Sequence, residues 1–163
     1  SFVDAIVIAA CVRRPVRFLI DHRIFAVPVL NFIFRTMRSI PIASAREDPT
    51  LKERALVDAA NALKAGEIVC IFPEGKITDT GEMSRFRPGL QRILELAPAP
   101  VVPMALRGLW GSFFSRSSQG RALRRLRGLF SRIALVAGPP LAPELATPEA
   151  LQEKVSSLRG DWR

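Results

Sequence analysis

The chain has 163 residues, of which 24 are Lys or Arg and 15 are Asp or Glu, so its net charge is +9. This length suits one domain, and a hydrophobic content of 48% excludes an intrinsically disordered chain. The longest stretch without a charged side chain has eleven residues, whereas a membrane-spanning helix needs about 20 apolar residues. We therefore expect residues 1–163 to form a single domain that does not cross a membrane.

The first residues form an almost unbroken apolar run from Phe2 to Val12. A signal peptide would carry a positively charged region before such a run, but here the run follows Ser1 directly. We therefore expect the chain to begin inside a structural element and to be a fragment of a longer protein.

Short apolar runs alternate with helical patterns along the chain, which is typical of an α/β fold rather than a helical bundle or a β-sandwich. Most of the runs are apolar throughout, as is usual for strands that are covered on both faces. Five runs are predicted to be strands: 16–20, 39–43, 68–72, 101–106 and 133–137.

The clearest helical pattern lies between the second and third predicted strands. Asp48 is suited to cap its first turn, Pro49 to occupy its first position, and Gly66 to close it shortly after Lys64. The residues that share its apolar face are Leu51, Ala55, Ala59, Ala62 and Leu63. We expect this face to pack on the sheet.

The two cysteines, Cys11 and Cys70, each lie in an apolar run, with no Cys-x-x-Cys spacing and no histidine nearby. Such positions predict buried, reduced thiols of a cytoplasmic protein. They indicate no metal site.

The segment from Pro73 to Arg87 follows the third predicted strand and has no periodicity over its fifteen residues. Loops of that length in compact domains are usually functional. Ligands of open α/β sheets bind beyond the carboxyl ends of the strands. We therefore expect a binding site at residues 72–75, where the chain leaves the strand.

Glu74 stands between Pro73, which restricts the backbone, and Gly75, which lets a substrate approach the backbone closely. A carboxylate presented in this way can hold a substrate hydroxyl, and the alternative is a turn that contains a glutamate without a binding role. Further along the loop, Arg87 precedes a helix that Pro88 can start. A phosphate group could then be bound by both the guanidinium and the helix N-terminus.

Four short blocks follow one another along the chain: Ser1-Phe2-Val3-Asp4, Phe72-Pro73-Glu74-Gly75, Phe86-Arg87-Pro88-Gly89 and Val102-Pro103-Met104-Ala105. Their order and spacing resemble the glycerophospholipid acyltransferase family, whose type members are 1-acyl-glycerol-3-phosphate acyltransferases. The first block matches the second half of the family's N-H-x-S-F-x-D motif. The resemblance extends from Ser1 to about Ala137 and places the catalytic histidine two positions before Ser1.

The resemblance implies an α/β, glycerol-3-phosphate acyltransferase-like fold with a mixed, mostly parallel sheet flanked by helices. It also implies a mechanism in which the histidine acts as general base on the glycerol hydroxyl of a lysophospholipid, which then attacks an acyl thioester. This scheme has no covalent enzyme intermediate and needs no metal or cofactor. Because the histidine precedes Ser1, we expect the chain as it stands to be inactive.

The same resemblance assigns roles to individual residues. Asp4 would orient the histidine and Glu74, the second catalytic residue, would hold the acyl acceptor together with Gly75. Arg87 would lie near the phosphate of the acceptor. The substrate-binding residues implied are Phe72, Pro73, Gly75, Arg87 and Arg46.

Two departures from the family pattern bear on the acceptor. The second family block often has the form I-P-V-D-R, whereas here Ser44 stands at the position of the arginine and Arg46 follows two residues later as its substitute. Lys76-Ile77 replaces a Thr-Arg pair. Both changes weaken the match to an enzyme for simple lysophosphatidate. The segments 40–49 and 105–116 more closely resemble 2-acylglycerophosphoethanolamine acyltransferase domains, which are often fused to a transporter or an acyl-carrier-protein ligase.

His22 is the only histidine of the chain. The position five residues further on, where the His-x-x-x-x-Asp motif would have an aspartate, is Val27. We therefore interpret His22 as a structural or surface residue.

The segment 107–132 contains seven arginines and no acidic residue. A short amphipathic helix is predicted over residues 121–130, and its basic face consists of Arg121, Arg124, Arg125 and Arg127. Such a face can bind an anionic membrane or a nucleic-acid backbone, or it can simply be solvated. We favour the membrane because the expected substrates are lipids, and we expect no nucleic-acid partner because no base-reading module is recognisable.

These observations favour an O-acyltransferase that transfers a fatty acyl group from acyl-CoA or acyl-carrier protein to a lysophospholipid, in phospholipid synthesis or remodelling. Acyl-carrier proteins are acidic, so the charge of the chain is compatible with such a partner. We expect the protein at the cytoplasmic face of the inner membrane, held peripherally or by segments outside this chain. The alternative is a non-catalytic lipid-binding or membrane-docking module of the same fold, for which the position two residues before Ser1 would not be histidine.

Overall fold

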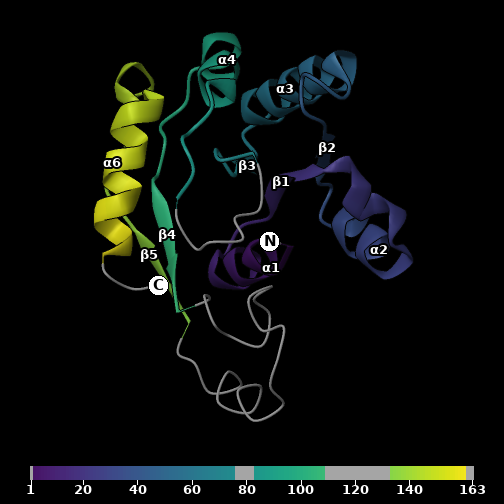
Figure 1. Ribbon diagram of the computed structural model, residues 1–163, viewed down its shortest axis with the longest axis horizontal. Helices are drawn as coiled ribbons and strands as arrows, with labels where there is room; N and C mark the ends of the chain where they lie inside the picture. Colours follow the sequence, from purple (N-terminus) through teal and green to yellow (C-terminus); the bar gives the residue numbers. More distant parts are fainter. Residues whose placement is uncertain (1, 76–82, 109–132, 161–163) are drawn as a thin grey trace.

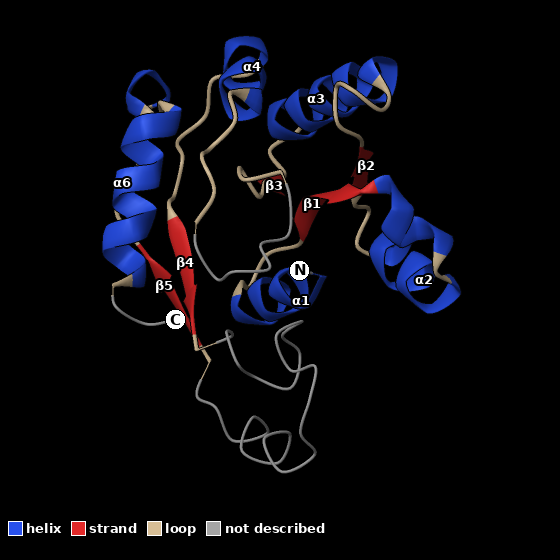
Figure 2. Cartoon of the chain, in the orientation of Figure 1, coloured by secondary structure: helices blue, strands red, loops and turns tan. Residues whose placement is uncertain are grey.

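The computed structural model describes residues 2–75, 83–108 and 133–160 (Figure 1). The basic face predicted at 121–127 and the Lys76-Ile77 pair lie outside the described residues. Figure 2 distinguishes the helices from the strands. In chain order the elements are α1 (Phe2–Cys11), β1 (Val16–Asp21), the 3-10 helix η1 (His22–Ala26), α2 (Pro28–Thr36), β2 (Ile40–Ile42), α3 (Pro49–Lys64), β3 (Ile68–Cys70), α4 (Gly89–Leu96), β4 (Met104–Arg107), β5 (Ala134–Ala137), the 3-10 helix η3 (Pro143–Leu145) and α6 (Pro148–Arg159).

Strand β1 is the centre of a three-stranded parallel sheet in the order β2-β1-β3. In its register, Asp21 lies beside Ile42 of β2, and Phe18 lies beside Cys70 of β3. Strands β4 and β5 form a separate antiparallel pair beside helix α6 (Figure 1). The predicted α/β fold with a parallel sheet flanked by helices is confirmed, but the antiparallel strands form a second sheet rather than part of one mixed sheet.

Helices cover both faces of the parallel sheet, and the side chains of β1 alternate between them. Leu19 packs into the core beneath α3 and α4. Phe18 and Ile20 pack into the opposite core, beneath α1 and α2. This double coverage accounts for the apolar composition of the strand. In the described part of the chain, no helix combines the length and the apolar character needed to cross a membrane.

Helix α3 has the limits that its sequence predicts. The Asp48 carboxylate accepts a hydrogen bond from the Leu51 N–H at 2.8 Å, and Pro49 is the first helical residue. At the other end, Gly66 has a φ of +75°, and the N–H of Glu67 donates to the carbonyl of Ala62, which is a Schellman motif. The fully buried residues of the helix are Ala55, Leu56, Ala59, Ala60 and Ala62, so Leu56 and Ala60 widen the expected apolar face.

Four of the five predicted strands are shorter than expected, since the runs 39–43 and 133–137 also lose residues at their ends. The run 68–72 leaves the sheet after Cys70, because the carbonyl of Phe72 accepts the N–H of Gly75 and closes a turn there. The run 101–106 begins at Met104 as strand β4. Pro103 has no N–H to contribute to a ladder, and Val101 instead pairs with Leu141 in an isolated antiparallel bridge.

The apolar run at the start of the chain is helix α1. Ala5 and Ile8 of this helix are buried in the core that contains Phe18 and Phe34. Cys11 lies in the last turn and is exposed, so the prediction that it is buried is wrong. Val12, four residues after Ile8 and just beyond the helix, packs against that core instead.

Helix α6 is an element that the sequence patterns above do not predict. Thr147 caps it by accepting a hydrogen bond from the Ala150 N–H at 3.2 Å, and Pro148 occupies its first position. The helix packs against β4 and β5. Its Leu151 is buried together with Phe86 and Leu94. These residues form a third core, in which α6 packs against α4 and the loop before it.

Candidate active site

The binding turn predicted at residues 72–75 lies at the carboxyl edge of the sheet, where β1, β2 and β3 end at Asp21, Ile42 and Cys70. The N–H of Gly75 donates to the carbonyl of Phe72 at 3.1 Å, and Gly75 has a φ of +62°, which favours glycine.

The Phe72 ring stacks on the Phe18 ring of β1, with centroids 6.4 Å apart and planes 15° from parallel. The half-buried Phe72 thus anchors the turn to the fully buried Phe18 of the sheet.

Glu74 is half-buried in this turn. Its Oε2 accepts a hydrogen bond from the Ser84 N–H at 2.7 Å. This bond ties the start of the loop to its return segment and fixes one carboxylate oxygen. Among the described residues no donor bonds to Oε1, and a carboxylate oxygen is an acceptor suited to a hydroxyl group.

Arg87 lies directly against the turn. Its N–H donates to the carbonyl of Pro73 at 2.9 Å. Its side chain crosses Gly75 so closely that a Cβ atom at position 75 would lie 3.0 Å from Cδ and Nε of Arg87. The loop thus brings together two of the predicted blocks, and the absence of a side chain at Gly75 makes room for the guanidinium.

The guanidinium of Arg87 is exposed and has no carboxylate within ion-pair distance among residues 2–75, 83–108 and 133–160. Helix α4 begins at Gly89, two residues later, and no side chain caps it. The predicted combination of an arginine and a helix N-terminus is therefore present. Such a combination is suited to an anion, and above all to a phosphate group.

The sequence patterns missed Gln152 of α6, which helps to hold the segment before Arg87 in place. Phe86, the neighbour of Arg87, is 6% exposed in the core shared by α4 and α6. The N–H of Phe86 donates to Oε1 of Gln152 on α6 at 3.1 Å. The Thr147-Pro148 pair, a typical helix start, is the feature of the sequence that could have revealed this helix.

Asp4 lies in the first turn of α1 and is half-buried. Its neighbour Ala5 is fully buried in the same core cluster against which Phe72 packs. The first turn of α1 and the turn that carries Glu74 therefore pack against the same core.

Arg46 and Ser44 lie on the other flank of the carboxyl edge. They belong to the turn after β2, in which the Ser44 carbonyl accepts the N–H groups of Glu47 at 3.1 Å and Asp48 at 3.0 Å. Arg46 is exposed in this turn. Since β2 and β3 lie on opposite sides of β1, no described contact joins Arg46 to Glu74 or Arg87.

His22 lies in a cluster of charged side chains at the end of β1. Its Nε2 is 3.6 Å from Oε1 of Glu47, and its Nδ1 is 3.6 Å from Oδ1 of Asp21. Arg23 donates to Glu47 at 2.9 Å, and this bond raises the pKa of the Arg23 guanidinium. No described contact connects the imidazole of His22 to Glu74.

The second thiol, Cys70, lies at the end of β3 and is largely covered. Burial raises the pKa of Cys70 to about 12, so the thiol is protonated at neutral pH and is a poor nucleophile. Within the described ranges, no three His, Cys, Asp or Glu side chains are gathered as metal ligands.

Residues 1–107 match the family model described as Acyltransferase. A chloroplastic 1-acyl-sn-glycerol-3-phosphate acyltransferase of Brassica napus is 28% identical over 120 residues, which are 74% of this chain and 34% of that protein. The 1-acyl-sn-glycerol-3-phosphate acyltransferase of Pseudomonas aeruginosa is 26% identical over 141 residues, 86% of this chain and 51% of that protein.

A solved structure has a similar fold. The crystal structure of the 1-acyl-sn-glycerophosphate acyltransferase PlsC from Thermotoga maritima superposes with a TM-score of 0.60 at 18% identity, covering 86% of this chain and 54% of that one. The chain thus spans a third to about half of the length of these relatives. Because the family model covers more than half of the sequence, the chain belongs to the acyltransferase family.

Proposed function

We propose that the protein transfers a fatty acyl group from an acyl thioester to the free hydroxyl of a lysophospholipid. The observation that supports this most directly is the contact between Arg87 and Gly75, beside the carboxylate of Glu74. It combines a cation suited to the acceptor phosphate with a carboxylate suited to an acceptor hydroxyl, at the edge of the sheet where α/β folds bind ligands.

In the proposed mechanism, a histidine two positions before Ser1 removes the proton of the acceptor hydroxyl, and Asp4 orients that histidine. The hydroxyl oxygen forms a bond to the thioester carbonyl carbon, the carbon–sulfur bond breaks, and the thiolate leaves with the proton returned by the histidine. Glu74 positions the acceptor through its glycerol hydroxyl, and Arg87 binds its phosphate. The remaining contacts to the acceptor come from Phe72, Pro73 and Gly75, with Arg46 at the other flank.

The identities of the acceptor and the donor are inferred from the relatives, from Ser44 and from the net charge. The two relatives named above are described as 1-acyl-sn-glycerol-3-phosphate acyltransferases, which favours lysophosphatidate. Ser44 at the position of the family's arginine favours a larger head group, such as that of 2-acylglycerophosphoethanolamine. Both acceptors carry a phosphate for Arg87. The net charge of +9 is compatible with acyl-CoA and with an acidic acyl-carrier protein as donor.

We also propose that the protein works at the cytoplasmic face of the inner membrane. Its acceptor and product are lipids, and the sequence carries seven arginines without an acidic residue over residues 107–132. An anionic membrane surface attracts such a segment by about 1 kcal/mol per basic residue.

An acyl-transfer assay tests the proposal. The full-length protein, incubated with a lysophospholipid and acyl-CoA or acyl-carrier protein, should form the diacyl product. Asp4→Asn should lower kcat by about a hundredfold, because a misoriented base loses much of the 100-fold to 10,000-fold effect of general base catalysis. Residues 1–163 alone should be inactive. Absence of product from the full-length protein with every acceptor and donor pair would leave the lipid-binding module as the better account.

A further inference from the structure

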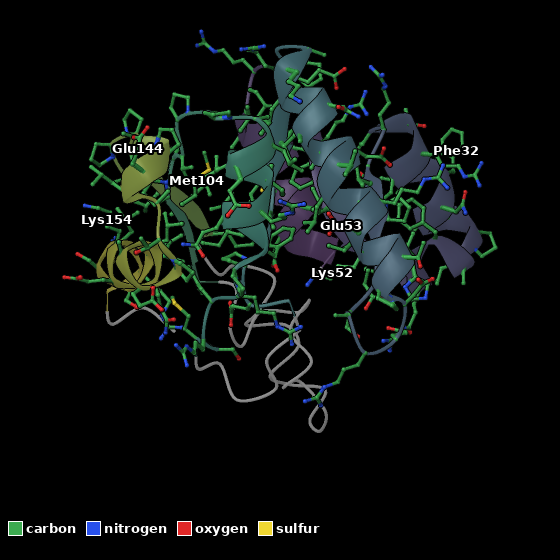
Figure 3. All side chains as sticks on the ribbon, turned by 90° about the horizontal axis from the view of Figure 1, so that it is seen from above. Phe32, Lys52, Glu53, Met104, Glu144 and Lys154 are labelled. Carbon is green, nitrogen blue, oxygen red and sulfur yellow. The ribbon has the colours of Figure 1, made fainter. Side chains whose placement is uncertain are left out.

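Helix α2 presents an apolar outer face that no described element covers. Val29 and Phe32 are 70% and 75% exposed, the largest exposed fractions among the large apolar side chains of the described residues, and Val27 at the helix N-cap is 47% exposed. The inner face of α2 is in the core through Phe34. Figure 3 shows Phe32 at the outer margin of the molecule, pointing away from the sheet.

The exposed side chains are aligned along the helix. Val29, Phe32 and Arg35 are spaced three residues apart, so they form one stripe on the helix surface. A stripe that combines apolar side chains with an arginine is typical of helices that lie in a membrane interface. The long stem of an arginine also lets its charged end reach the lipid head groups while its carbons stay in the apolar layer.

The arginines around α2 differ in whether a carboxylate compensates their charge. Residues 22–38, which contain η1, α2 and the turn after it, include Arg23, Arg35 and Arg38 and no acidic residue. Arg23 pairs with Glu47 at 2.9 Å and Arg38 pairs with Glu67 at 3.3 Å, whereas Arg35 has no ion pair among the described residues. The uncompensated charge of Arg35 on the stripe and the net charge of +9 of the chain are complementary to an anionic surface, whereas a basic protein partner would be repelled.

The position of α2 relates this face to the candidate active site. The helix follows β1 through η1, so it starts at the carboxyl edge of the sheet and runs back to the beginning of β2. Its first turn, with Val27 and Val29, therefore lies at the same edge as the turn that carries Glu74. A lipid surface in contact with this end of α2 would bring acceptor molecules to the edge where the site is open.

We propose that the outer face of α2, formed by Val27, Val29, Phe32 and Arg35, is a docking surface for an anionic lipid bilayer. The helix lies in the interface with Val29 and Phe32 among the upper acyl-chain segments and Arg35 at the head groups. The inference rests on the proposed function in one respect, since a lipid acceptor is what makes such docking useful. Bilayer binding itself does not depend on the reaction.

Sedimentation with vesicles tests the inference without substrate or acyl donor. The full-length protein is mixed with vesicles of phosphatidylcholine and phosphatidylglycerol. The double variant V29Q/F32Q should bind about tenfold more weakly than the unsubstituted protein, because it withdraws two apolar side chains from the bilayer. The matched control is L145Q. Leu145 is 62% exposed, and its neighbour Glu144 lies on the opposite side of the molecule from Phe32 (Figure 3). This variant should bind like the unsubstituted protein.

Two further measurements complete the test. R35Q should weaken binding to the anionic vesicles more than to vesicles of phosphatidylcholine alone. The tryptophan emission of F32W is compared with that of the unsubstituted protein, which has tryptophans of its own. F32W should show additional emission, and brominated lipid should quench it. Both substitutions are at exposed positions, so neither requires the core to repack.

Several results would overturn the inference: no vesicle binding by the unsubstituted protein, equal binding by V29Q/F32Q, or no quenching in F32W. A dimer that V29Q/F32Q converts to a monomer, with vesicle binding unchanged, would make the face an interface between two copies. Acyl transfer to a short-chain, water-soluble lysophospholipid is measured on the same variants. If the unsubstituted protein shows no acyl transfer in this assay, the result counts against the proposed function and not against the docking surface.

Discussion

Gly75 illustrates how a single missing side chain shapes the candidate site. It has a φ of +62°, and the side chain of Arg87 occupies the space where a Cβ atom would lie. Both facts require glycine, the first because of backbone strain and the second because of the close approach. The sequence alone predicted a close approach at Gly75, but by a substrate; the structure adds that Arg87 is the group that approaches. That contact could not be predicted because it depends on the path of the loop between them.

Gly75→Ala should therefore impair acceptor binding as well as stability. We expect a loss of about 1 kcal/mol in the free energy of unfolding from the positive φ. We also expect a rise of about tenfold in the KM for a lysophospholipid, because the new methyl group displaces the guanidinium from the acceptor phosphate. Urea unfolding and steady-state kinetics of the full-length protein measure the two effects.

The matched control is Gly66→Ala. Gly66 has a φ of +75°, but a Cβ atom there would have no neighbour within 4 Å. Gly66→Ala should lose a similar amount of free energy of unfolding and keep the KM of the unsubstituted protein. An equal rise in KM for both variants would mean that general destabilisation, and not the position of Arg87, determines acceptor binding.

Among the elements, α3 was predicted most completely because its signals are local. Its cap, its first-turn proline and its closing glycine are all adjacent to the helix in sequence. Helix α6 also has a local start at Thr147-Pro148, but its importance comes from a distant contact. Gln152 bonds to Phe86, 66 residues earlier in the chain. Local patterns contain no information about such a partner.

Asp48→Ala should destabilise α3 and with it the sheet that the helix covers. Removing the carboxylate leaves the Leu51 N–H without its acceptor at 2.8 Å, and loss of such a cap costs about 1 kcal/mol. Asp58→Ala is the control, because Asp58 is exposed in the middle of the same helix and alanine is the better helix former there. Urea denaturation should show a lower midpoint for Asp48→Ala only. Equal midpoints for Asp48→Ala and the unsubstituted protein would contradict the role of the cap.

At the scale of the whole molecule, a charged cluster ties three segments together at the edge of the sheet opposite the site. Glu67 precedes β3, and its carboxylate bonds to Arg17 of β1 and, at 3.3 Å, to Arg38 before β2. Arg14 donates to the carbonyl of Gly66 at 2.7 Å. One carboxylate thus holds the amino ends of all three parallel strands in register.

This cluster predicts a pH dependence of stability. The hydrogen bond from Arg17, followed by the charges of Arg17 and Arg38, lowers the pKa of Glu67 below its ordinary value of 4.5. A lowered pKa contributes stability that is complete above the unfolded value and is lost as the pH falls through the folded value. Glu67→Gln should therefore reduce stability at pH 7 and flatten its decrease below pH 4.5. Glu53→Gln, which removes an ion pair to Arg92 on the helix surface, is the control. If the stability of Glu67→Gln falls as steeply at acid pH as that of the unsubstituted protein, the result contradicts this account.

The overall architecture was predictable to the extent that it follows from hydrophobic patterns. Doubly covered strands such as β1 are mostly apolar, and the alternation of such runs with helical patterns predicted an α/β fold, while the mostly parallel sheet was implied by the resemblance to the family. The same pattern could not show that β4 and β5 pair separately, because strand pairing depends on contacts between distant segments. It also misplaced Cys11, since an almost uniformly apolar helix does not reveal which of its faces is exposed.

The central claim is that Arg87 binds the phosphate of the acyl acceptor, and the KM for the acceptor in Arg87→Ala tests it most directly. The full-length variant is compared on a lysophospholipid and on a monoacylglycerol that has no phosphate. Arg85→Ala is the control, because Arg85 lies on the same loop with a side chain 88% exposed, 3.7 Å from Glu149. We predict a rise of about tenfold or more in the KM of Arg87→Ala for the lysophospholipid, no change for the monoacylglycerol, and no change in either KM for Arg85→Ala. An equal rise with both acceptors, or the same rise in Arg85→Ala, would contradict the claim.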